Sequence, residues 1–173
     1  MKSVVKQLAA GKRNQTDDLA EVLDCALNRP QTIIELAACA AHDKANVAAR
    51  AIWVIRKIVE IDPKLLARHK RIIFAKLTSS PHWEVRAELC HIIPKLSLTR
   101  RESLAAIAFF ESCQGDTSKI VRTWSLHAMY EFSKSMANMK PRVLRMVSQA
   151  LKSEVPSIRA RARNIQEELE CAA

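Results

Sequence analysis

Glycine is nearly absent from this sequence, with only Gly11 and Gly115 among 173 residues. Glycine-rich phosphate-binding loops need several positions without a Cβ atom, where backbone N–H groups can approach a phosphate. The sequence therefore excludes such loops. Folds rich in β-turns also depend on glycine at many positions, so its scarcity argues against a β-sheet protein.

Long apolar runs and paired cysteines are missing as well. No apolar run reaches the roughly 18 residues of a membrane-spanning helix, and the first residues carry Lys2 and Lys6 without the apolar core of a secretory signal. The five cysteines include no Cys-x-x-Cys pair, which is typical of reduced thiols in the cytosol. We therefore expect a cytoplasmic protein that does not bind a membrane.

Motifs for metal binding and catalysis are also absent. Zinc sites commonly use ligand pairs two to four residues apart, whereas the closest His and Cys here are Cys90 and His91, which would point about 100° apart on a helix. There is neither His-Glu-x-x-His nor Gly-x-Ser-x-Gly. We expect no metal, no cofactor and no small-molecule substrate. The sequence favours a non-catalytic protein and leaves an enzyme as the other alternative.

The sequence does contain an excess of positive charge. It has 28 Lys and Arg residues against 18 Asp and Glu residues, a net charge of +10. Such a balance predicts an acidic partner, either a protein or a nucleic acid. Hydrophobic residues make up 49% of the chain and recur at regular intervals, which indicates a folded chain.

An internal repeat with a period near 37 residues runs through most of the sequence. Four similar segments begin at Val47, Val85, Val121 and Ile158, at spacings of 38, 36 and 37 residues. Apolar residues follow at offsets of eight and eleven, except for Gln166 in the last copy, and this spacing places them on one face of a helix. A polar turn and another helical run precede each segment, so the predicted unit is a first helix, a short turn and a second helix.

The pattern Val-Arg-x-x-Ala-x-x-x-Leu-x-x-Leu after an Asp or Pro turn resembles the HEAT repeat over about residues 30–171. Val85 and Arg86 match it best, together with Val121 and Arg122, whereas Ala48 replaces the arginine in the first copy. The resemblance implies an all-α fold, a right-handed α–α superhelix or solenoid of about four helix pairs after an N-terminal cap. The expected division is a cap over 1–29 and one continuous domain over 30–173, with pairs at about 30–60, 63–97, 99–135 and 140–171.

Residues at the predicted helix boundaries agree with this reading. Thr99 and Glu102 have the spacing of a capping box. Arg86, Arg122 and Arg159 occupy the HEAT arginine position, which the resemblance implies braces the turn below. Pro94 lies inside the second helix of the second pair, where we expect a bend. The helix should then resume, because Leu96 continues its apolar face.

The second helices line the concave surface of such a superhelix. Positions three, six and ten residues after each repeat start point away from the core and form columns across neighbouring helices. The predicted partner-binding residues at these positions are Trp53, His91, Trp124, His127, Arg50, Lys57, Lys95, Glu88 and Glu131. The middle column holds no aliphatic residue, which is typical of a lined cleft. The alternative is an ordinary solvated helix face, and Trp83 is predicted to pack against its turn.

The two histidines of the middle column suggest a dependence on pH. We expect His91 and His127 to be partly exposed on adjacent helices and to repel each other when both are protonated. An acidic partner should then bind more tightly as the pH falls from about 7.5 to 6.

Charges in the predicted groove nearly balance, and the positive excess falls on the first helices and the last helix. The residues concerned are Lys64, Arg68, Arg71, Arg100, Arg101, Lys140, Arg142, Arg145, Arg159, Arg161 and Arg163. A duplex held in the groove would need many inward-pointing cations. This distribution therefore argues against a duplex in the groove.

Two functions follow from these observations. The first is a non-catalytic interaction or scaffold module that binds a protein or peptide, expected to be acidic, through the concave groove or the basic outer surface. The alternative is a DNA-binding protein similar to the HEAT-like DNA alkylation-repair glycosylases, with or without glycosylase activity. That resemblance implies a cleft with aromatic residues and an acidic residue, but no catalytic motif of the family can be aligned with this sequence.

Overall fold

The structure is a computed structural model that describes residues 4–13 and 15–171. All regular elements in these residues are helices, with no strand among them. They are α1 (Val4–Ala10), η1 (Asp17–Leu19), α2 (Ala20–Asn28), α3 (Pro30–Ala40), α4 (Ala45–Ile61), α5 (Lys64–Ala67), α6 (Lys70–Ile72), η2 (Ile73–Leu77), α7 (Trp83–Ile92), η3 (Ile93–Lys95), α8 (Arg100–Cys113), α9 (Lys119–Ser133), η4 (Ala137–Met139), α10 (Lys140–Leu151) and α11 (Pro156–Cys171). The prediction of an all-α fold is confirmed.

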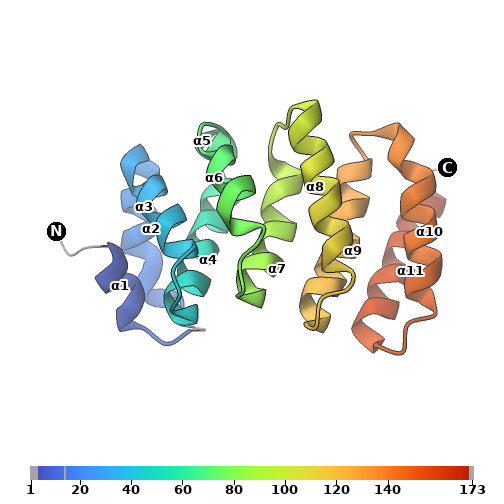
Figure 1. The fold of residues 1–173 in the computed structure, drawn as a ribbon, viewed down its shortest axis with the longest axis horizontal. Coiled ribbons are helices and arrows are strands. Elements are labelled where there is room, and N and C mark those ends of the chain that lie inside the picture. Colours follow the sequence, from blue (N-terminus) through green and yellow to red (C-terminus); the bar gives the residue numbers. More distant parts are fainter. Residues whose placement is uncertain (1–3, 14, 172–173) are drawn as a thin grey trace.

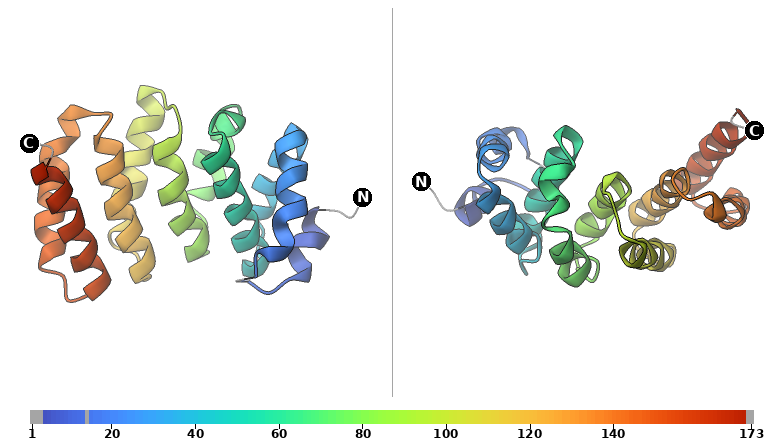
Figure 2. Two further views of the ribbon diagram at one scale, coloured as in Figure 1. Left: turned by 180° about the vertical axis from the view of Figure 1, so that it is seen from behind. Right: turned by 90° about the horizontal axis from the view of Figure 1, so that it is seen from above.

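The helices form pairs that follow one another along the longest axis of the molecule (Figure 1). The first helices of the pairs are α3, then α5 and α6 with η2, then α8 and α10; the second helices are α4, α7, α9 and α11. Each second helix packs against the next, α4 on α7, α7 on α9 and α9 on α11. Figure 1 looks onto α6, α8 and α10, whereas the left view of Figure 2 looks onto α7, α9 and α11.

The apolar positions of the sequence repeat form the core between these helices. The repeat starts Val47, Val85, Val121 and Ile158 are all buried. Gln166, the polar exception, is exposed on the last helix. At the other end of the row, α1 and α2 pack against α3 and α4 and cover the apolar face that the first pair would otherwise expose.

Polar side chains fix the helix starts and the turns between helices. The capping box is confirmed, since the Thr99 hydroxyl accepts from the N–H of Glu102 and the Glu102 carboxylate accepts from the N–H of Thr99. The Arg86 guanidinium donates to the carbonyl of Ser80 in its own turn and to Asp116 in the next turn, at 2.7 and 2.6 Å. Arg86 therefore ties two successive turns together.

Pro94 ends its helix instead of bending it. The α-helix stops at Ile92, one 3₁₀ turn follows over Ile93–Lys95, and Leu96 has extended backbone angles. The expectation that the helix resumes is wrong, because the ring removes a backbone donor and clashes with the preceding turn. Ile93 and Leu96 are nevertheless buried, so the 3₁₀ turn and the residue after it complete the apolar face.

Truncating the side chains of the core should destabilise the fold. Leu89 and Phe132 are 0% and 5% exposed, and Leu89→Ala or Phe132→Ala should lower the free energy of unfolding by roughly 2–5 kcal/mol, measured by urea denaturation. Leu104, which is 61% exposed on α8, is the control. Leu104→Ala should change the free energy of unfolding by less than about 0.5 kcal/mol. A loss that small for Leu89→Ala would mean that the core is assigned wrongly.

Candidate functional site

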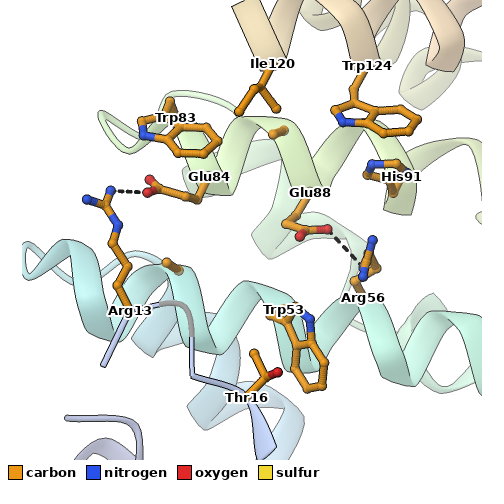
Figure 3. A pocket seen from close by; sticks show the side chains of 12 residues that line it. Arg13, Thr16, Trp53, Arg56, Trp83, Glu84, Glu88, His91, Ile120 and Trp124 are labelled. Carbon is orange, nitrogen blue, oxygen red and sulfur yellow. Dashed lines mark ion pairs between the residues drawn. The ribbon is translucent and has the colours of Figure 1, made fainter. Parts of the chain in front are cut away.

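All three tryptophans of the chain line one hollow of about 410 Å³ on the second-helix side (Figure 3). Trp53 extends from α4, Trp83 from the first residue of α7 and Trp124 from α9. Each keeps part of its ring exposed. Trp83, which was expected to pack against its own turn, lines the hollow together with the other two.

Two ion pairs give the hollow its polar walls. Arg13 pairs with Glu84, and the Nε atom of Arg56 lies 3.1 Å from Oε2 of Glu88 (Figure 3). Because one arginine faces each glutamate, the walls carry no net charge. Burial raises the pKa of Glu88, and the nearby Arg56 opposes that rise.

Two carboxylate oxygens in these walls are left without hydrogen bonds. Oε2 of Glu84 and Oε2 of Glu88 are buried and accept no hydrogen bond from the described residues. Although Arg56 is close enough to Glu88 for an ion pair, the two atoms are not aligned for a hydrogen bond. Both oxygens are covered by neighbouring atoms of the walls.

His91 and His127 pack against the Trp124 ring. The centroids lie 4.2 Å from Trp124 for His91 and 5.8 Å for His127, and the Arg161 guanidinium carbon is 4.6 Å from the centre of the Trp124 ring. Burial, then Arg56 and His127, lowers the pKa of His91 from 6.5 to about 4, and burial together with Arg161 lowers the pKa of His127.

The expected pH dependence is therefore wrong for His91. A histidine with a pKa of about 4 stays neutral between pH 7.5 and 6, so it gains no charge there that could attract an acidic partner. The two histidines do lie on adjacent helices and are partly exposed, as the sequence predicts.

The structure brings together some of the predicted partner-binding residues and separates others. Trp53, Glu88, His91 and Trp124 line the hollow. Lys57 and Glu131 lie outside it in ion pairs with Glu60 and Lys134. Lys95 is exposed on the 3₁₀ turn. His127 lies between the rings of Trp124 and Tyr130, with centroids 5.8 and 6.5 Å away.

Arg50 does not face a partner, and its assignment to the groove is wrong. It is 0% exposed, and its guanidinium donates to the carbonyls of Lys12 and Gln15 and to Asp18, the last at 2.7 Å. This hydrogen bond lowers the pKa of Asp18. Arg50 thereby holds residues 12, 15 and 18 against α4, and we call the described residues 11–13 and 15–18 segment 11–18.

The segment held by Arg50 also builds one wall of the hollow. Arg13 and Thr16, which line the hollow, both lie in it. Asn46 donates to the carbonyl of Gly11 at 2.9 Å and adds a second tie. The site therefore depends on an N-terminal segment that the sequence predicted only as a cap.

Within residues 4–13 and 15–171, no group of three or more His, Cys, Asp and Glu residues is placed to hold a metal ion. In the same residues, no helix is long and apolar enough to span a bilayer. Neither a protein-family model nor a curated protein matches this sequence.

Replacing Gly11 should loosen the wall formed by segment 11–18. A methyl group at Gly11 would overlap the buried Arg50 guanidinium, so Gly11→Ala should lower the free energy of unfolding by roughly 1–3 kcal/mol and speed proteolysis within 11–18. The control is Gly115→Ala, because a methyl group at Gly115 would meet its nearest neighbour at an ordinary 3.7 Å. Equal stability of the two variants would contradict the Arg50 packing.

The neutral state of His91 can be tested by NMR titration of its ring protons. We expect a midpoint near pH 4, and Arg56→Gln should raise it toward 6.5, since a positive neighbour is removed. Unfolded chains protonate this histidine at its ordinary pKa, so His91 should reduce stability as the pH falls from 6.5 to 4. The matched control is Lys119→Gln, which should leave the midpoint unchanged. A midpoint near 6.5 in the unaltered protein would contradict the burial of the ring.

Proposed function

We propose that the chain is a non-catalytic interaction module of the HEAT-like α-solenoid kind, which binds a segment of a partner protein on its second-helix side. The observation that carries this proposal is the convergence of all three tryptophans on one hollow. Tryptophans are enriched among the residues that dominate binding energy in protein interfaces. Partly exposed ones from the second helices of three successive pairs are unusual for a solvated surface.

The lining of the hollow indicates the kind of segment it suits. Its apolar part, Trp53, Trp83, Trp124 and Ile120, fits one large aromatic or aliphatic side chain. The side chains of Glu84 and Glu88, which are 13% and 21% exposed, would accept N–H groups of the same segment. Because the walls are neutral, an acidic character of the partner is not required at this site.

DNA in the same hollow is the alternative. Aromatic rings beside a carboxylate would suit an unstacked base. The cations that would hold the flanking phosphates are few, however, because Arg13 and Arg56 are engaged by Glu84 and Glu88. Phosphate contacts supply most of the affinity of DNA-binding proteins, so this balance favours the protein segment.

A selection from a random peptide library on the full chain would test the module. We expect recovered peptides to share one aromatic or aliphatic anchor and to shift the tryptophan emission, which in this protein arises only from the hollow. Trp53→Ala should weaken their binding at least about tenfold, as for a central interface residue. Glu88→Gln should weaken it less, since an acceptor oxygen remains.

Leu104→Ala is the matched control, because it removes an exposed apolar side chain from α8, outside the hollow. It should leave peptide affinity unchanged. Binding that survives Trp53→Ala within twofold, or a library that yields no common anchor, would overturn the proposal. Tight binding of a DNA duplex that is lost with Trp53→Ala would favour the alternative.

A further inference from the structure

The positive charge of this protein is concentrated on the first helices of three pairs. Residues 62–78, 99–114 and 139–152 contain eleven Lys or Arg residues and three Asp or Glu residues. These segments carry a charge of +8 out of the total of +10. The rest of the chain, including the neutral hollow, is close to balanced.

Ion pairing neutralises little of this charge. Glu102 pairs with Lys70 at 3.0 Å, Glu111 pairs with Arg142, and Asp62 accepts the backbone N–H of Lys64. The cations left over are all exposed and make no ion pair with any described residue. We call these nine the basic band; they are Lys64, Arg68, Arg71, Lys76, Arg100, Arg101, Lys140, Arg145 and Lys152.

The segments that carry the basic band lie on one side of the molecule. Six of its nine cations lie on α5, α6, α8 and α10, which face the viewer in Figure 1, and the other three are Arg68 directly after α5, Lys76 in η2 and Lys152 directly after α10. Arg71 and Arg101, from successive pairs, line the same surface hollow of about 570 Å³. The ion pair between Arg142 and Glu111 links α10 to α8 in turn. The charges therefore run across three adjacent helix pairs.

We infer that the basic band binds the phosphate backbone of a duplex nucleic acid, independently of the partner segment in the hollow. Packed helices lie about 8–10 Å apart, so three pairs extend over roughly 20–30 Å, close to one turn of B-DNA at about 34 Å. A duplex presents a phosphate charge every 1.7 Å or so of its axis. Such a partner can neutralise many of the nine cations at once.

The side chains of the basic band favour phosphates over other anions. Five of the nine are arginines, whose planar guanidinium groups bind phosphate oxygens bidentately. The tryptophans and the single tyrosine all lie on second helices, and Phe74 is the one aromatic residue that lines the hollow between Arg71 and Arg101. The band therefore offers no row of aromatic rings on which successive single-stranded bases could stack. This combination favours contact with the backbone of a duplex, without preference for a base sequence.

Fluorescence anisotropy with a labelled 20-base-pair DNA duplex tests the inference. The test variant replaces Arg71, Arg100, Arg101 and Arg145 with Gln. The control variant replaces Lys12, Lys44, Lys119 and Arg163, exposed cations outside the band, with Gln and so loses the same charge. Affinities are measured between 50 and 200 mM salt, and thermal melting confirms that both variants fold.

The full chain should bind the duplex, with affinity that falls steeply with salt. The test variant should bind at least about tenfold more weakly at 50 mM salt, and its slope of log K against log salt should be smaller by about 3 to 4, near 0.9 for each lost contact. The control should retain most of the affinity. No binding at 50 mM salt, or equal weakening of both variants, would overturn the inference.

Two other polyanions serve as competing probes. Leu104 and Leu144 are exposed on α8 and α10 beside the basic band, and an acidic protein or an anionic membrane could use them. Polyglutamate and vesicles containing anionic lipid are therefore measured alongside the duplex at equal charge concentration. Tighter binding of either one than of the duplex would overturn the assignment to nucleic acid. Weaker binding of both would support it.

Discussion

A charge that is removed completely from water is costly unless it is paired and hydrogen-bonded. Arg50 finds its partners in one short stretch of chain: its two terminal nitrogens donate to the carbonyls of Lys12 and Gln15 and to the carboxylate of Asp18, while its Nε has no hydrogen-bond partner among the described residues. These residues have to lie on α4 for the two terminal nitrogens to be paired. Gly11 provides the space, and the tryptophan-lined hollow gains its outer wall as a result.

The repeat made most of the helical framework predictable from sequence. Apolar residues at a fixed helical spacing have to be buried together, so the core positions followed from Val47, Val85, Val121 and Ile158 alone. Pro94 was misjudged because Leu96 fits the helical period. A 3₁₀ turn followed by extended backbone can bury that same residue without a continuing helix.

The candidate site was only partly predictable. A helical wheel identifies the side that faces away from the core, and Trp53, His91 and Trp124 were found in that way. It cannot show that another segment returns to cover that side, as segment 11–18 does over Arg50. Trp83 was missed because the columns began at Val85, although eight residues place it only about 80° from the direction of His91.

The two ends of the row of helices are held by different contacts. This difference determines which end should unfold locally first. At the N-terminal end a buried arginine, its carbonyl partners and Asn46 hold segment 11–18 on α4. At the other end α11 leaves Gln166 exposed, and Arg159 reaches only Ser153 in its own turn, whereas Arg86 also reaches the following turn. Local unfolding starts where an element is held least, so it should start at α11 and α10 and reach the contacts of Arg50 last.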